Sequence, residues 1–460
     1  MKNIVTLRAI VPTLSWLQAW QVCLHLCLFL SAIVMSLLGT RWAFFLLALL
    51  PLAFLPFSYA RVRLHELLVQ LFDSRELAAP VCVGLIGLGI VCDVVMIAQL
   101  FTARTEQRHP LLHGPGIAWV GPIWFSAHAL FFLGDTIARL VYWLVCLLLQ
   151  IFLLRSACTP ALSFSPGRRH FLQQLGVLGA GAPFFVSLSN VKLSYDFRVE
   201  EHELTLPQWP PALDGLRLAH LSDIHVGGAM NRERLLHMAR LTNNARPDLV
   251  VHTGDFLTHR RGDFDAPLYE ALARIHAPYG QWACLGNHDF DAPEQLVRRL
   301  TRAGVTVLRD TVVTVSVWGQ PLEIAGLDYV FGDRARGAWY TELMRGWPSR
   351  TATPRILLNH DPRAFALLPA ACAHLVLSGH THGGQVGVQW GKAAALTVVG
   401  LLGIPDQGVF QRREMTLYVT RCVGFYGYPM RLGIPPEIAL LTLRAPRSSS
   451  PVYRNAQARQ

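Results

Sequence analysis

The residues best suited to chemistry in this sequence are aspartate, histidine and asparagine side chains gathered in five short clusters. Oxygen and imidazole ligands without thiolates are the mixture expected for Mn, Fe or Zn in a hydrolytic site. Two metals about 3.5–4 Å apart would need one bridging carboxylate and further ligands on either side, and Asp255 is the natural bridge. The clusters are Asp223-Ile224-His225, Gly254-Asp255, Gly286-Asn287-His288-Asp289, Asn359-His360-Asp361 and Gly379-His380-Thr381-His382-Gly383-Gly384-Gln385.

Short apolar runs precede these clusters, as expected if each cluster lies where a strand ends. The runs cover residues 216–221, 248–253, 282–285, 355–358 and 374–377, and residues 231–243 and 292–303 have helical periodicity. The carboxyl ends of strands form the ligand crevice of open α/β sheets, so the clusters should converge there. Further strands expected over 312–318, 321–327, 417–420 and 438–443 favour a mixed sheet or two packed sheets.

The order and content of the clusters resemble the calcineurin-like metallophosphoesterase superfamily, whose signature runs D-x-H, GD, GNHD, H and GHTH. Every element is present in order between Asp223 and His382, and the general layout extends over about residues 195–443. The resemblance implies a layered α/β/β/α domain with mixed sheets. It also implies two divalent ions (Mn, Fe or Zn), with Asp255 as the bridge, one ion held by Asp223, His225 and His382, and the other by Asn287, His360 and His380.

The same resemblance implies metal-dependent hydrolysis of a phosphoester. A hydroxide between the metals would attack phosphorus, and His288 would protonate the leaving oxygen or stabilise the transition-state charge, with Asp289 orienting its ring. From the residues alone, Asp289 could equally cap the following helix. Asn359 and Asp361 could be turn residues around His360.

Composition indicates a membrane protein. Of the 460 residues, 52% are hydrophobic and only 15% are charged, against roughly 25% charged in an ordinary soluble domain. Apolar stretches over 17–38, 42–59, 78–101 and 117–154 meet the requirement of about 20 residues for a bilayer crossing. The last is overlong, so it crosses either once as an extended helix or twice with a hinge at Gly134. Asp135 and Arg139 within it favour a packing pair over a transport path.

A segment resembling a twin-arginine export signal, Ser165-Pro166-Gly167-Arg168-Arg169-His170-Phe171-Leu172, follows these stretches. It could instead be the positive flank of a fifth helix, and both interpretations place the arginines in the cytoplasm. Eight loop Lys and Arg residues fall on that side and three on the other, so we expect the chain after about residue 190 outside the cytoplasmic membrane. The predicted organisation is a membrane domain of about four helices (1–160), a signal or anchor helix (161–192), a metallophosphoesterase domain (193–445) and a disordered basic tail (446–460).

The net charge of +11 leaves open whether the partner is a membrane, an anionic substrate or nucleic acid. No dense basic run with interleaved aromatics occurs, so no nucleic acid is expected. Arg421, Tyr426 and Arg431 could bind a phosphate or headgroup, or be ordinary packed loop residues. The nine cysteines contain no CxxC pair, and Cys422 stands where relatives are expected to carry glycine.

The sequence also resembles the membrane-anchored, twin-arginine-exported branch of the superfamily. That branch includes phosphodiesterases and enzymes that split the pyrophosphate of UDP-linked acylated glucosamine. The leading hypothesis is therefore a membrane-anchored phosphodiesterase or pyrophosphatase that contacts membrane lipid and acts on a phosphoester substrate, with lipid-linked phosphoesters among the candidates. The alternative is a transport or sensor protein with a non-catalytic metal-binding domain, against which the intact His288 and ligand set argue.

Overall fold

The computed structural model describes residues 194–226, 230–258, 265–347, 353–389, 395–425 and 431–446. It also describes residues 182–183 and 185–190 and seven isolated residues between 92 and 144. The chain divides into two compact units, Met1–Leu188 and Ser189–Gln460.

Within the described part of the chain, no helix is long and apolar enough to cross a membrane. The four predicted crossings lie outside the described residues apart from the isolated positions, as do the twin-arginine segment and the predicted tail beyond residue 446. The N-terminal helical membrane bundle therefore has no support from the structure and stays a prediction.

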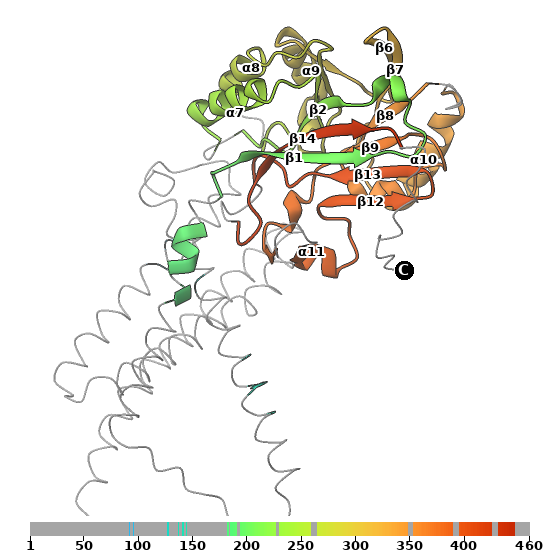
Figure 1. The fold of residues 1–460 in the computed structure, drawn as a ribbon. Helices are drawn as coiled ribbons and strands as arrows, with labels where there is room; N and C mark the ends of the chain where they lie inside the picture. Colours follow the sequence, from blue (N-terminus) through green and yellow to red (C-terminus); the bar gives the residue numbers. More distant parts are fainter. Residues whose placement is uncertain are drawn as a thin grey trace, which may run out of the picture. The chain divides into compact units, whose positions relative to one another are not determined.

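The second unit is built on two six-stranded sheets (Figure 1). Both are mixed, since each combines parallel central strands with antiparallel pairs. In sheet order, the first contains β1 (Arg198–Thr205), β14 (Glu437–Arg444), β2 (Leu216–Leu221), β3 (Leu249–His252), β4 (Gln281–Ala283) and β5 (Val305–Val307). The second contains β12 (Gly408–Arg412), β13 (Met415–Val419), β9 (Leu375–Ser378), β8 (Arg355–Leu358), β7 (Gln320–Gly326) and β6 (Thr311–Val317).

Helices connect the strands, and short 3-10 turns lie between them. The α-helices are α7 (Arg232–Asn244), α8 (Ala266–Leu272), α9 (Pro293–Arg302), α10 (Asp333–Arg345) and α11 (Val398–Leu401). The 3-10 turns are η1 (Pro211–Leu213), η3 (Asn287–Asp291), η4 (Pro362–Ala366) and η5 (His382–Gly384), and a small hairpin pairs β10 (Gly387–Val388) with β11 (Leu396–Thr397). The predicted helices at 231–243 and 292–303 and the later strands are confirmed, each within a few residues.

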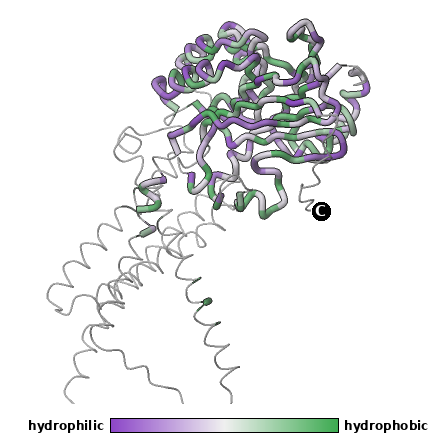
Figure 2. The backbone as a smooth tube through the Cα atoms, in the orientation of Figure 1, coloured by the Kyte–Doolittle hydropathy of each residue, from purple (hydrophilic) through white to green (hydrophobic). Residues whose placement is uncertain are grey.

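The period of two along each strand divides its side chains between two apolar cores. On β2, Leu216 and Leu218 lie in the core between the sheets, whereas Ala219 and Leu221 pack in the core that contains residues of α7, α8 and α9. On β9, Leu377 faces the inter-sheet core and Val376 faces a third core that includes Tyr340 of α10. The layers therefore run α/β/β/α, as predicted, and Figure 2 shows hydrophobic colour along the inner strands.

Replacing Leu218 by alanine should destabilise the domain by about 2–5 kcal/mol, because the side chain is fully buried between the sheets and its loss leaves a cavity. Urea unfolding of the purified protein followed by near-ultraviolet circular dichroism measures the change. Thr314→Ala, at an exposed position of β6, is the control and should change stability by less than about 0.5 kcal/mol. Equal effects of the two substitutions would contradict the assignment of the inter-sheet core.

Candidate metal centre

The predicted ligand clusters converge because they follow adjacent strands of both sheets. β2 and β3 are parallel neighbours that lead to Asp223 and Asp255, and β8 and β9 are parallel neighbours that lead to His360 and His380. The carboxyl edges of the two sheets meet here, as expected for a ligand crevice. All seven predicted ligands lie in the described part of the chain, and the structure brings them together.

One group of ligand atoms belongs to Asp223, His225 and His382, all buried, and these atoms lie within 4.8 Å of one another. The Nε2 atom of His382 is 3.3 Å from Asp223 Oδ1, and that of His225 is 3.8 Å from the same oxygen. One carboxylate and two imidazoles in this spacing suit a divalent transition metal.

The second group is formed by Asp255, His360 and His380, again within 4.8 Å of one another. His360 Nε2 lies 3.3 Å from Asp255 Oδ2 and 3.1 Å from the amide oxygen of Asn287. Asp255 Oδ2 is also 3.6 Å from Nε2 of His225, which belongs to the first group. The same carboxylate oxygen therefore faces both groups, which is the position a bridging ligand requires.

Hydrogen bonds to backbone carbonyls orient two of the imidazoles. His360 Nδ1 lies 2.6 Å from the carbonyl oxygen of Thr253, and His382 Nδ1 lies 3.4 Å from that of Gly424. A carbonyl can only accept, so each Nδ1 donates its proton and each Nε2 turns toward the carboxylates. This arrangement, in which the outer nitrogen is held by an acceptor, is typical of metal-binding histidines.

One carboxylate oxygen of Asp223 accepts three hydrogen bonds, and the other faces the ligand histidines. Its Oδ2 accepts from Ser222 Oγ (2.5 Å), the backbone N–H of His380 (2.9 Å) and the thiol of Cys422 (3.2 Å). Its Oδ1 is buried and receives no hydrogen bond from the described residues. A buried carboxylate oxygen without a donor is costly, so the donor set fits a bound cation at this point.

The backbone is strained at the ligands. Asp223, His225, Asp255, His380 and His382 have φ between 48° and 67°, a left-handed region that residues other than glycine seldom occupy. Each such residue costs of order 1–3 kcal/mol and persists only where its surroundings fix it. Five of the seven predicted ligands share this conformation. The surrounding structure therefore holds their backbone in a strained conformation that directs these side chains toward one point.

Three glycines allow the ligand loops to approach one another. A Cβ atom on Gly379 would lie 2.0 Å from Ser222 Oγ and 2.2 Å from Asp223 Oδ2, and one on Gly286 would lie 2.2 Å from Asp255 Oδ1. Gly254 has φ of 89°, and a Cβ there would lie 2.2 Å from the backbone nitrogen of Gly286. Glycine is required at these positions because backbone and carboxylate occupy the space of a side chain.

His288 lies beside the first ligand group on η3. Its backbone N–H donates to Asp255 Oδ1 (2.8 Å), and its half-buried ring is 5.3 Å, centroid to centroid, from that of His225. The carboxylate of Asp289 accepts the backbone N–H groups of Asp255 (2.7 Å), Gly286 (2.9 Å) and Phe256 (3.0 Å). Asp289 thus ties the two loops that carry Asp255 and His288 to each other.

Asp289 does not cap α9, which begins after Ala292 and has no side-chain cap. Its carboxylate does accept the backbone N–H of Gly286 at the start of η3, so it has a capping contact there. That Asp289 orients the ring of His288 stays a prediction. Asp361 does fulfil the turn interpretation, since its side chain accepts from the backbone N–H of Arg363 (3.0 Å) where η4 begins.

Opposite charges balance inside this buried site. Burial opposes protonation of His360, but the Asp255 and Asp223 carboxylates raise its pKa to about 10. Burial would raise the pKa of Asp223, yet His382 and His360 hold that pKa well below its usual range. Burial and the adjacent Asp255 carboxylate raise the pKa of Asp289. Without metal, a proton on His360 therefore supplies positive charge between the carboxylates.

The two predicted substrate-binding arginines that are described lie inside the domain. Arg421 pairs with buried Glu437, with Nη2 2.6 Å from Oε2. Arg431 is 1% exposed and donates to the carbonyl oxygens of His382 (3.0 Å) and Gly424 (2.5 Å). Both guanidinium groups hold the protein's own loops, as in the packed-loop interpretation, and their contact with substrate stays a prediction. Tyr426 lies outside the described residues.

Aromatic residues beside the second ligand group had no motif to signal them. The ring of Tyr329 lies 6.0 Å from that of His360 and 6.1 Å from that of His380, centroid to centroid. Phe331, 66% exposed, packs edge to face against Tyr329 at 4.8 Å. They form an aromatic edge to the site that only the tertiary structure reveals.

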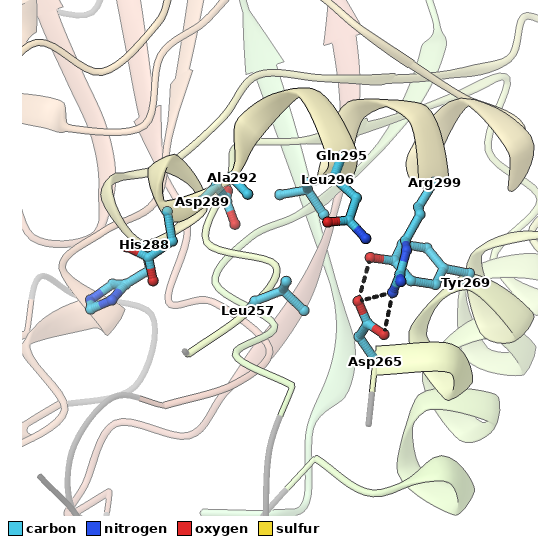
Figure 3. A pocket seen from close by; sticks show the side chains of 10 residues that line it. Leu257, Asp265, Tyr269, His288, Asp289, Ala292, Gln295, Leu296 and Arg299 are labelled. Carbon is cyan, nitrogen blue, oxygen red and sulfur yellow. Dashed lines mark hydrogen bonds and ion pairs between the residues drawn. The ribbon is translucent and has the colours of Figure 1, made fainter. Parts of the chain in front are cut away.

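A small pocket has His288 at one end (Figure 3). Leu257 and Leu296 form its apolar middle, and the far end holds an ion pair in which Arg299 Nη1 is 2.7 Å from Asp265 Oδ1. Sequence patterns did not indicate this pocket, because its walls come from α8, α9 and η3 together.

Known proteins are similar to this chain over the domain that carries the ligand clusters. The family model of calcineurin-like phosphoesterases matches residues 216–384. The chain is 30% identical over 259 residues to an uncharacterized metallophosphoesterase of Aquifex aeolicus, covering 55% of this chain and 93% of that protein. It is 32% identical over 263 residues to a transmembrane protein with metallophosphoesterase domain from Danio rerio, and the match covers 54% of this chain and 57% of that protein. It is 26% identical over 292 residues to the UDP-2,3-diacylglucosamine pyrophosphatase LpxG of Chlamydia muridarum, and the match covers 51% of this chain and 86% of that protein.

The chain therefore belongs to the calcineurin-like metallophosphoesterase family. It is a phosphoester hydrolase, and the two ligand groups are candidate sites for the divalent metals that this family uses.

Gly379→Ala should lower the metal content of the purified protein to less than about a tenth of the parent value, because the new methyl group would displace Asp223. Inductively coupled plasma mass spectrometry measures the bound metal. Gly346→Ala, where the nearest atom is 3.7 Å away, is the matched control and should retain it. Full metal occupancy in the Gly379 variant would show that Asp223 does not bind metal.

Metal binding should release protons at pH 7.5. His360, with its pKa raised to about 10, carries a proton in the metal-free protein and must lose it to bind a cation. Metal affinity should therefore increase with pH, by about tenfold per unit between pH 6 and 8 if one proton is released. Calorimetric titration with Mn²⁺ in buffers of different ionisation enthalpy measures the release, and binding heats independent of the buffer would contradict it. His360→Gln should remove this component.

Proposed function

We propose that this protein is a membrane-anchored binuclear metallophosphohydrolase that cleaves a phosphodiester or pyrophosphate bond in a lipid-linked substrate. Its catalytic domain would lie on the outer side of the cytoplasmic membrane, exported through the twin-arginine-like segment. The metals would be two divalent ions, Mn, Fe or Zn. The observation that carries the chemistry is the position of Asp255 Oδ2, 3.3 Å from His360 and 3.6 Å from His225, between two groups of ligands.

Support for the substrate class and for the membrane comes from relatives and from composition. A relative named as a UDP-2,3-diacylglucosamine pyrophosphatase acts on a lipid-linked pyrophosphate, and another is named as a transmembrane protein. The apolar stretches before residue 155 have the length of bilayer crossings. A hydrolase tethered beside the bilayer would meet such lipids at high local concentration.

The protein's own groups would position and protonate the substrate. Divalent ions in such a site supply positive charge at the phosphoryl oxygens and lower the pKa of water. His288, whose backbone N–H donates to Asp255, would give a proton to the leaving oxygen. Asp289 holds the His288 loop to the Asp255 loop through the backbone amides of Asp255 and Phe256. The arrangement needs no covalent intermediate on the protein.

The first test is turnover of bis(p-nitrophenyl) phosphate by the metal-loaded protein. Asp255→Asn should abolish turnover because it weakens both ligand groups, and chelation of the metal should do the same. His288→Ala should keep the metal but lower kcat by about 10²–10⁴-fold, the usual contribution of a general acid. Unchanged turnover in both variants would refute the proposed catalytic site.

His276→Ala is the control for loss of an imidazole, since His276 is exposed and outside the ligand groups. It should have the parent's activity and metal content. Reporter fusions after Asn190 test the topology separately, and a cytoplasmic location of the reporter would contradict export while leaving the chemistry intact.

A further inference from the structure

An uncharged aliphatic surface projects next to the metal centre. In the described part of residues 189–460, nine large apolar side chains are exposed, and six of them lie between residues 388 and 409. Five of the six form what we call the α11 patch, with exposures from 44% to 73%: Val388, Leu396, Val398, Leu401 and Leu402. Exposed aliphatic side chains concentrated in one segment usually mark an interaction site.

The segment that carries the patch is almost free of charge. Between residues 382 and 411, the only Asp, Glu, Lys or Arg residues are Lys392 and Asp406. Asp406 is buried and accepts a hydrogen bond from the hydroxyl of Thr397, so it adds no surface charge. Lys392 lies outside the described residues. Among the described residues of this segment, no charged side chain is exposed, and the exposed side chains of α11 are aliphatic.

Internal contacts hold the patch firmly to the loop of the ligand histidines. The hydroxyl of Thr397 caps α11 by accepting the backbone N–H of Gly400 (2.9 Å). Thr381, between His380 and His382, donates its hydroxyl to the carbonyl oxygen of Asp406 (2.7 Å). Gly384 packs so closely on Thr397 that a Cβ would lie 2.8 Å from its side chain. Whatever binds the patch is thus placed beside the metal centre.

The chemistry of the patch favours lipid over protein. Energetically dominant residues of protein interfaces are Trp, Tyr and Arg, with Leu and Val under-represented. The α11 patch holds only Leu and Val and offers no charge to a partner. Exposed aliphatic side chains such as these are suited to enter the boundary between headgroups and acyl chains. The apolar stretches that end about 35 residues before Ser189 would keep a bilayer within reach.

We propose that the α11 patch inserts into the membrane interface and holds the metal centre at the level of the lipid headgroups. This inference rests on the proposed membrane anchoring and deepens the proposed function, because it assigns the surface that presents a lipid-linked phosphoester to the site. The occupant is a lipid surface, and the competing occupants are the chain's own first 188 residues or a second copy.

Photo-crosslinking of the full chain in vesicles of phosphatidylethanolamine and phosphatidylglycerol identifies the occupant. A benzophenone side chain in place of Leu402 should yield lipid adducts, detected by mass spectrometry of the peptide. The same probe in place of Trp318, which is 45% exposed on the β6–β7 turn, is the control and should yield few. Crosslinks from position 402 to residues 1–188 or to a second chain, or no more lipid adducts than at position 318, would overturn the proposal. This readout does not depend on activity.

Enzyme kinetics provide a second test of the proposed docking of the α11 patch to the membrane. The double variant Leu401→Asp/Leu402→Asp should lower turnover of a vesicle-embedded lipid pyrophosphate by at least about tenfold, with hydrolysis of soluble bis(p-nitrophenyl) phosphate unchanged. Equal turnover of the vesicle-embedded substrate by parent and variant would overturn the docking proposal. A parent protein that hydrolyses neither substrate would instead contradict the proposed function, so the two failures are distinguishable.

Discussion

The structure depends on placing one carboxylate, that of Asp255, between two groups of buried imidazoles. Its Oδ2 lies within 3.6 Å of a histidine nitrogen from each group, while its Oδ1 accepts the backbone N–H of His288. Charges this close in a buried site interact strongly, so they must be balanced by protons or cations. The strained backbone of five ligands and the crowded glycines are consequences of this requirement, because only such loops bring the side chains so near.

The two-sheet architecture satisfies that requirement with rigid supports. Parallel strands from each sheet deliver two loops to the same edge, and hydrogen bonds between loops fix their relative positions. His360, on a loop of the second sheet, donates to the carbonyl oxygen of Thr253 in the first. Arg431, far along the chain, braces the loop of His382 through its carbonyl oxygen. A ligand set distributed over both sheets is precise because the core between them is tightly packed.

The ligand set and the strands before it could be predicted because both follow local rules. Apolar runs that end in Asp, Asn or His need only strand periodicity and the position of strand ends to be interpreted. Arg421 and Arg431 show what such rules leave out: a guanidinium suits a phosphate, but the rules do not reveal that Glu437 and loop carbonyls lie within the reach of these two. Asp289 likewise resembles a helix cap, whereas its partners include Asp255, 34 residues away in sequence. The exposure of the α11 patch depends on tertiary packing and has no sequence signal of its own.

The central claim, that two metal ions share Asp255, is tested most directly by electron paramagnetic resonance of the manganese-loaded protein. The account predicts two Mn²⁺ per chain with the multiline spectrum of an exchange-coupled pair, which Asp255→Asn converts to that of isolated ions. A single uncoupled Mn²⁺ signal at saturating metal in the parent protein would contradict it.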